Sequence, residues 1–250
     1  MITYQSYGNP NNPILCLLPG AGLGTWAYKQ IIPLVKKNFY VIIPNVLSNF
    51  ITINDAVYQL HELVTKKFNG KIQVLAGLSS GAQIALKLIT ISPNICNELL
   101  LESCAAFPQS ISKLIKPLTN LSFPLTRFKC FNKLQAFALH LPSNEYESYN
   151  QEIKNMSKQT LINILIANTT FNVKSFIPIN FQGKTFIVYG TKEKRIIVKS
   201  SHYLAKKLAN AKIIPLKNYH HGELTLKHPL KFSNIINMLK DTCKKESSKV

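Results

Sequence analysis

The stretch that decides the fold reads Lys71-Ile-Gln-Val-Leu-Ala-Gly-Leu-Ser79-Ser-Gly-Ala-Gln-Ile-Ala-Leu-Lys-Leu-Ile-Thr-Ile91. Its first part, residues 71–76, predicts a buried strand, and residues 82–91, rich in Ala, Leu and Ile, predict a helix. Between them lies the pentapeptide from Gly77 to Gly81. A tight turn from strand to helix needs both glycines, because a Cβ atom there would collide with the neighbouring backbone. The stretch therefore predicts a turn that holds the Ser79 hydroxyl above the edge of a sheet.

The same alternation of strand and helix continues in both directions from this stretch. Apolar and β-branched runs predict buried strands over residues 13–18, 39–43, 98–102, 184–189 and 212–216. Helical patterns predict helices over residues 26–37, 55–68, 199–209 and 229–243. Strands that alternate with helices form βαβ units, whose right-handed crossovers produce a parallel sheet covered on both faces. The chain is therefore expected to have an α/β fold.

The alternation stops between residues 104 and 180. Prolines at positions 108, 117, 124 and 142 punctuate this segment, which also shows helical patterns over residues 131–139 and 158–168. We therefore divide the chain into a core of residues 1–103 and 181–250 and a helical insertion of residues 104–180. Residues 244–250 are expected to form a frayed, basic tail.

The composition bounds the class of protein. A chain of 250 residues with 46% hydrophobic content can bury one substantial core, which allows one or two domains and argues against disorder. The 30 basic and 11 acidic residues give a net charge of +19, which suits phosphate-rich or acidic partners. The lysines run through the whole chain rather than along one stripe, so nucleic-acid binding is not expected. Lysine-rich composition is itself an alternative explanation of the charge.

The lack of a recognisable targeting signal and the pattern of the cysteines predict a cytoplasmic protein. The first ten residues lack the basic start and apolar run of a secretory signal, and no uncharged apolar stretch reaches the roughly 18 residues that span a bilayer. The five cysteines are odd in number, widely separated and without a CxxC pair, so they read as reduced thiols. No metal site is expected, because a structural zinc site needs closely paired thiolates.

Ser79 is the candidate nucleophile. A serine on such a turn projects its oxygen above the sheet, and the following helix directs backbone N–H groups, especially that of Ser80, at the same point. These groups could stabilise the oxyanion that forms when Ser79 attacks a carbonyl. The alternative is a turn of small residues without chemistry.

A serine hydroxyl needs a base, and His220 and His221 are the best placed of the six histidines. Both follow the last predicted strand, where a loop meets the carboxyl edge of the sheet. We prefer His221 because the neighbouring Gly222 permits a close backbone approach. The remaining histidines are expected to be structural or solvated; these are His61, His140, His202 and His228, the last of which would help to start the final helix.

The third member of such a site is an acid that orients the imidazole. Both aspartates, Asp55 and Asp241, lie outside the interval between Ser79 and His221, so an acid in that interval must be a glutamate. We favour Glu193, because it follows the predicted strand 184–189 at the same sheet edge. Glu102 is the reserve. The other glutamates of the interval are Glu98, Glu145, Glu147 and Glu152.

A second oxyanion donor is expected in the loop Pro19-Gly-Ala-Gly22, which follows the first predicted strand. The backbone N–H of Ala21 can supply it. A phosphate loop is a weaker interpretation, since the spacing is not GxGxxG and the lysine of GxxxxGK[ST] is missing.

Together these motifs make the chain resemble the α/β-hydrolase superfamily over nearly its full length. Leu18 to Gly22 resembles the oxyanion loop of the family, Gly77 to Gly81 its nucleophile elbow, Gly190 to Glu193 its acid loop, and His221 to Pro229 its histidine loop. Two departures are Pro19, where the family often has His, and Glu193, where it usually has Asp. The resemblance implies an eight-stranded, mostly parallel sheet, a cap inserted after the sixth strand, and an acyl-enzyme mechanism with no metal or organic cofactor.

The expected function is that of a serine hydrolase, a carboxylesterase or lipase-like enzyme that cleaves a small-molecule ester with a small or medium acyl chain. An alternative is a thioesterase or esterase acting on an acyl group borne on an anionic carrier, such as an acyl carrier protein, coenzyme A or a lysophospholipid. No acidic residue lies between Glu102 and Glu145, where lysines alternate with phenylalanines, and this pattern favours such a carrier. A further alternative is a non-catalytic protein that binds a ligand on the same fold.

Overall fold

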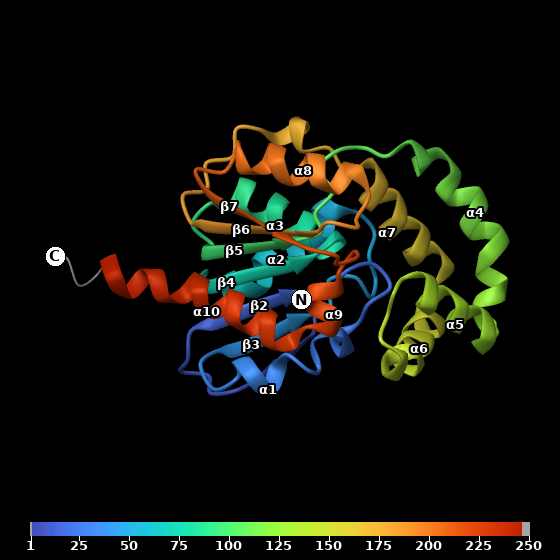
Figure 1. The fold of residues 1–250 in the computed structure, drawn as a ribbon, viewed down its shortest axis with the longest axis horizontal. Coiled ribbons are helices and arrows are strands. Elements are labelled where there is room, and N and C mark those ends of the chain that lie inside the picture. The colour runs from blue at the N-terminus through green and yellow to red at the C-terminus, as the bar shows by residue number, and fades with distance from the viewer. Residues whose placement is uncertain (1, 247–250) are drawn as a thin grey trace.

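The computed structural model describes residues 2–246 of the chain, and the side chains of residues 2–239. Its centre is a seven-stranded sheet with the strand order β1-β3-β2-β4-β5-β6-β7 (Figure 1). Only β1 runs antiparallel to its neighbour, β3, and the other pairs are parallel. The strands are β1 (Tyr4–Tyr7), β2 (Ile14–Leu18), β3 (Tyr40–Pro44), β4 (Ile72–Leu78), β5 (Cys96–Glu102), β6 (Lys184–Gly190) and β7 (Asn210–Leu216).

The expected α/β class is confirmed, but the expectation of eight strands is wrong for the described residues. The sheet has seven strands, and the long insertion follows β5 rather than a sixth strand. The strongly apolar run of residues 161–166 in the insertion is part of the helix Lys158–Thr170, so it adds no strand to the sheet. The sequence also gave no sign of β1, whose residues are at least partly exposed at the sheet edge.

Helices cover both faces of the sheet because the central strands are apolar on both sides. Successive residues of a strand point to opposite faces. In β2, Cys16 and Leu18 join one buried cluster, which includes residues of α2 (Ile53–Lys67), α3 (Ser80–Ile91) and α8 (Arg195–Ala205). Leu15 and Leu17 join the other cluster, with α1 (Ile32–Val35), α9 (Glu223–Lys227) and α10 (Pro229–Glu246).

Two predicted helices differ from those in the structure. The pattern over residues 26–37 forms a 3-10 helix, η1 (Thr25–Tyr28), and the short α1. Pro33 lies in the first turn of α1, where its missing N–H is tolerated, but its ring would clash with the previous turn of a continuous helix. The helix expected over residues 199–209 is α8, which starts four residues earlier. The chain has to leave that helix before Asn210, where β7 begins to pair with β6.

The insertion is helical and stands over the carboxyl edge of the sheet (Figure 1). Its α-helices are α4 (Ile115–Ser122), α5 (Lys129–Ala138), α6 (Tyr146–Asn155) and α7 (Lys158–Thr170), and its 3-10 helices are η2 (Ser110–Leu114), η3 (Phe123–Arg127), η4 (Ser143–Glu145) and η5 (Val173–Phe176). Among residues 2–246, we find no helix that is both long enough and apolar enough to cross a membrane.

Candidate active site

Ser79 sits at the sharp turn between β4 and α3. Its φ of 53° and ψ of −111° place a non-glycine residue in a region that L-residues rarely adopt. The turn leaves no space at its two glycines, as the sequence predicted. A Cβ atom on Gly77 would lie 2.5 Å from the carbonyl group of Gly81, and one on Gly81 would lie 2.2 Å from the carbonyl oxygen of Leu18. The strained backbone holds the Ser79 side chain out of the sheet.

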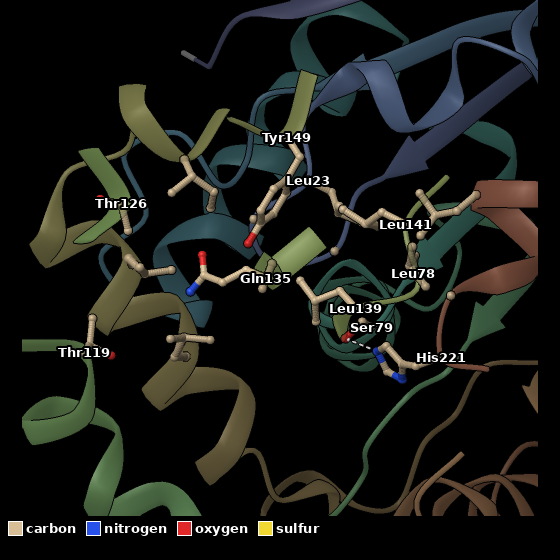
Figure 2. Close-up of a pocket in the computed structure, with 18 of the residues that line it drawn as sticks. Leu23, Leu78, Ser79, Thr119, Thr126, Gln135, Leu139, Leu141, Tyr149 and His221 are labelled. Atoms are coloured by element: carbon tan, nitrogen blue, oxygen red, sulfur yellow. Dashed lines mark hydrogen bonds between the residues drawn. The ribbon is translucent and has the colours of Figure 1, made fainter. Parts of the chain in front are cut away.

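Ser79, His221 and Glu193 form a continuous chain of hydrogen bonds. The Ser79 Oγ lies 3.0 Å from the Nε2 of His221 (Figure 2), and the Nδ1 of the same ring lies 2.7 Å from the Oε2 of Glu193. His221 belongs to the turn between β7 and α9, where the adjacent Gly222 adopts a left-handed φ of 69°. Three loops that are distant in sequence thus meet at the carboxyl ends of β4, β6 and β7.

The Glu193 carboxylate is fixed on all sides. Its side chain has no exposed surface, whereas half of the His221 side chain is exposed. The Oε1 of Glu193 accepts hydrogen bonds from the backbone N–H of Gly190 at 2.8 Å and from the Oγ of Ser103 at 2.9 Å. The arrangement leaves the second oxygen, Oε2, for the imidazole.

Ser103 is a site residue that the sequence reasoning missed. Its hydroxyl donates to Glu193 and accepts from the backbone N–H of Gly222 at 3.1 Å, so it links the acid to the loop of His221. Ser103 also has a left-handed φ of 55°. It follows β5 directly, and the argument that selected Glu193 from its place after β6 would have selected Ser103 as well.

The reserve acid, Glu102, lies below the site without contacting His221. It is 3% exposed, and the hydroxyl and the backbone N–H of Thr225 donate hydrogen bonds to its carboxyl group. Burial raises the pKa of Glu102 to about 7, and the hydrogen bonds from Thr225 oppose that rise. This placement favours a structural role for Glu102 in anchoring α9.

The two expected oxyanion donors lie on either side of Ser79. Ser80 is the first residue of α3, so its N–H has no acceptor in a preceding helical turn. Ala21 follows β2 and lines the same cavity as Ser79. The Oγ of Ser80 accepts a hydrogen bond from Asn168 of α7 at 3.0 Å, which ties the insertion to the turn.

The structure places the other histidines in different surroundings. The rings of His140 and His220 stack with 3.9 Å between their centroids, and the backbone N–H of His220 donates to Glu223. His228 stacks on Tyr219 and immediately precedes α10. His61 and His202 lie on α2 and α8. The imidazole that lies within hydrogen-bond distance of Ser79 is that of His221.

Ser79 and His221 border two cavities. One has a volume of about 330 Å³, and its wall combines the Ser79 turn with residues from four insertion helices (Figure 2). Its leucines lie at positions 23, 78, 139, 141, 161, 165 and 226. Thr119 and Thr126 lie at the end away from Ser79, and Gln135 lies between that end and Ser79 (Figure 2). The other cavity, of about 360 Å³, is lined by more polar groups, which include Lys194, His140 and Asn168.

The cysteines and carboxylates form no metal site in the part of the chain with described side chains, where no suitable group of three ligands occurs. Cys16, Cys96 and Cys104 are free and buried, and burial raises their thiol pKa values. Cys130 is free and exposed, and the side chain of Cys243 lies outside the described residues.

Comparison with known proteins supports the fold. No protein-family model and no curated protein matches the chain. Among solved structures, the chain is similar to a protein of Desulfitobacterium hafniense described as a member of the alpha/beta hydrolase family, with 18% identity, a TM-score of 0.76 and coverage of 95% of this chain and 99% of that one. It is similar to a thermophilic esterase of Thermogutta terrifontis, with 16% identity, a TM-score of 0.76 and coverage of 96% and 93%.

A third similar structure comes from a study of carboxylesterases of the ammonia-oxidizing thaumarchaeon Nitrososphaera gargenis. It shares 15% identity with this chain, with a TM-score of 0.79 and coverage of 97% of this chain and 95% of that one. Similarity at such low identity establishes the arrangement of the elements, since unrelated reactions use the same fold. The protein therefore has the α/β-hydrolase fold.

Proposed function

We propose that the protein is a serine hydrolase that cleaves carboxylic esters of small or medium acyl chains. The observation that carries this proposal is the chain of contacts from Ser79 through His221 to Glu193, with lengths of 3.0 and 2.7 Å. A nucleophile, a base within hydrogen-bond reach and a third group that orients the base form a recognised catalytic arrangement. The names of two similar structures, an esterase and a carboxylesterase, agree with it.

The geometry supports a two-step reaction. The Oγ of Ser79 attacks the ester carbonyl while the Nε2 of His221 takes its proton, and the N–H groups of Ala21 and Ser80 stabilise the negative oxygen. His221 then gives the proton to the departing alcohol, which leaves an acyl group on Ser79. Water attacks that acyl group, its proton passes to His221, and the Oγ of Ser79 regains a proton as the acid departs. Glu193 stabilises the charged imidazole in both steps.

The insertion supplies the acyl pocket in this proposal. Residues 104–180 act as a cap, because α4, α5, α6 and α7 all contribute side chains to the cavity beside Ser79. Its volume of about 330 Å³ is at the lower end of the range for ligand pockets, roughly 300–1,000 Å³. Leucines dominate the wall near Ser79, so an aliphatic acyl chain is the occupant that the cavity fits best.

The proposal is tested with p-nitrophenyl esters of graded chain length. We expect hydrolysis of the acetate, butyrate and hexanoate esters, and we expect Ser79→Ala to lower kcat by about three or more orders of magnitude. Circular dichroism and the unfolding midpoint of the variant should match those of the parent. Equal activity of Ser79→Ala and the parent protein would refute the role of this residue.

An acyl group on an anionic carrier is a second candidate substrate. The observation that favours it is Lys194, which lines the second cavity beside Ser79 and could attract a phosphate group. Acyl-coenzyme A thioesters assayed in parallel with neutral esters distinguish the two substrates. Activity on the anionic substrate should fall steeply between low and high salt if its charge contributes to binding, and a flat salt response would exclude this candidate.

A further inference from the structure

Exposed apolar side chains gather on one part of the insertion. Of the fifteen large hydrophobic residues that are exposed in the described part of the chain, nine lie between positions 111 and 139. They are Ile111, Leu114, Leu118, Leu121, Leu125, Phe128, Leu134, Phe137 and Leu139. Isolated exposed hydrophobic residues are common on soluble proteins, but a contiguous group of them marks an interaction site.

The first five of these residues form a stripe. Their separations of three, four, three and four residues bring successive side chains to one side of the helical segment η2-α4-η3. Leu121 has 78% of its surface exposed and Leu114 has 55%. An adjacent side of α4, with the buried Ile115 and Thr119, packs toward α7 and the cavity. The stripe is therefore an outward apolar surface on a helix whose inner side is already packed.

The segment that carries the stripe also carries exposed positive charge. No Asp or Glu occurs between Glu102 and Glu145, whereas this interval contains five basic residues, Lys113, Lys116, Arg127, Lys129 and Lys133. Lys129 pairs with Glu147 of α6. The exposed Lys113, Lys116 and Arg127 belong to the same segment as the stripe. A second copy of the chain would bring these cations against like charges, which is unfavourable.

We propose that this segment docks on an anionic lipid surface. We call Ile111, Leu114, Leu118, Leu121 and Leu125, with Lys113, Lys116 and Arg127, the docking face. Apolar side chains that enter the interface, flanked by cations that attract anionic headgroups, are the combination that holds an amphipathic helix on a membrane surface. Figure 1 shows α4 at the end of the molecule remote from α10, where a planar surface can reach it.

The docking face belongs to a segment that lines the far end of the cavity beside Ser79. Thr119, Ser122 and Thr126 come from the same segment and line the cavity that contains Ser79. A docked molecule would thus hold this cavity next to the lipid. The inference goes beyond the proposed function and does not require it, because binding is measured without any turnover.

The experiment measures co-sedimentation of the full chain with vesicles. One set contains phosphatidylglycerol and phosphatidylcholine in equal parts, and the other contains phosphatidylcholine alone. We expect binding to the first set, and binding at least about tenfold weaker to the second, because the exposed cations of the docking face are attracted to anionic headgroups and not to neutral ones. The variant Ser79→Ala should bind like the parent, which separates docking from catalysis.

Two pairs of variants test the two parts of the docking face. Leu118→Ser with Leu121→Ser should weaken binding by about tenfold or more, whereas Ile91→Ser with Leu230→Ser, at positions 57% and 68% exposed on other helices, should not. In the same way, Lys113→Gln with Lys116→Gln should weaken binding by about tenfold, whereas Lys36→Gln with Lys37→Gln, an equal change in net charge, should change it by less than about threefold.

Three results would overturn the proposal. The first is equal sedimentation with both vesicle sets or with neither. The second is an equal loss of binding in the docking-face and control variants, which would mean that net charge alone attracts the protein. The third is dimerisation of the parent protein in gel filtration that Leu118→Ser with Leu121→Ser abolishes, since a second copy would then cover this face.

Discussion

Replacing Glu193 with glutamine removes the charge of the acid but keeps the size of its side chain and one acceptor oxygen. The glutamine keeps an oxygen that can accept from Gly190 or Ser103, but it removes the negative charge 2.7 Å from the His221 Nδ1. The imidazole becomes positively charged when it takes the proton of Ser79. The variant should therefore destabilise the transition state much more than the resting enzyme.

The size of the effect follows from the distance and the exposure. Two unit charges about 4 Å apart attract by about 4 kcal/mol at an effective dielectric constant of about 20. That energy corresponds to a rate factor of about 10³. Half of the His221 side chain is exposed, and water screens part of the attraction. We therefore expect Glu193→Gln to lower kcat by about 10² to 10³.

The assay is steady-state hydrolysis of p-nitrophenyl butyrate, with Glu102→Gln as the matched control. Glu102 is also a buried glutamate after a strand of the sheet, but Thr225 rather than His221 contacts its carboxyl group. The control should keep kcat within about fivefold of the parent value, because the carboxylate that contacts the imidazole, that of Glu193, is retained. The reverse ranking, with Glu102→Gln inactive and Glu193→Gln active, would refute the assignment of the acid.

Three further predictions concern the surroundings of the site. The pKa of Glu102 is raised to about 7, so the folded protein holds the proton of this carboxyl group more tightly than the unfolded chain does. The protonated carboxyl group therefore adds to the free energy of unfolding in full below about pH 4.5, and this contribution is lost as the pH rises through 7. In urea titrations, the unfolding free energy of Glu102→Gln should therefore rise relative to that of the parent by on the order of 3 kcal/mol from pH 4.5 to 7.5, and a constant difference would contradict this. Gly81→Ala should lower the Tm by several degrees more than Gly70→Ala, because only the former Cβ meets backbone, at Leu18, although Gly70 has a φ of +72°; equal Tm values would show that the turn has room. Thr119→Trp should fill the far end of the cavity and lower kcat/KM for p-nitrophenyl decanoate at least tenfold while that for the acetate stays within twofold, and a uniform loss would place the acyl chain elsewhere.

The parallel strands could be read from the sequence because each is an apolar run. The six predicted strands agree with β2 to β7 within two residues at either end. The strands β2 to β6 lie inside the sheet, where burial on both faces removes polar residues from the pattern. The edge strand β7 is only partly buried, and its pair Ile213-Ile214 supplied the β-branched signal. The strand β1 escaped prediction because Tyr4-Gln-Ser-Tyr7 pairs only at the edge and keeps exposed polar side chains.

The helices of the insertion were harder to predict than those of the core. The patterns over residues 131–139 and 158–168 correspond to α5 and α7, but α4 and α6 were not predicted. In α4 the apolar residues Leu118 and Leu121 face outward, and Pro117 lies in its first turn. The three- and four-residue spacing of the apolar residues from Ile111 to Leu125 is helical, but Pro117 and Pro124 in the same stretch are typical of a break in a helix.

The candidate site followed from position, because residues after parallel strands meet at one edge of the sheet. This argument selected Ser79, Glu193 and His221, which the structure brings into contact. It favoured Glu193 over Glu102 by its place after the strand 184–189, but position alone does not say which carboxyl contacts the imidazole. Only the structure shows that the Glu102 carboxyl turns toward Thr225 while Ser103 and Gly190 aim Glu193 at the imidazole.

Labelling with a fluorophosphonate tests most directly whether Ser79 is an activated nucleophile. Intact-mass measurement of the labelled protein, followed by peptide mapping, should find one adduct, located on Ser79. The adduct should form at least about a hundredfold more slowly in His221→Ala, since the base is then missing. An unlabelled parent protein, or an adduct on another serine with Ser79 unmodified, would contradict the proposed catalytic role.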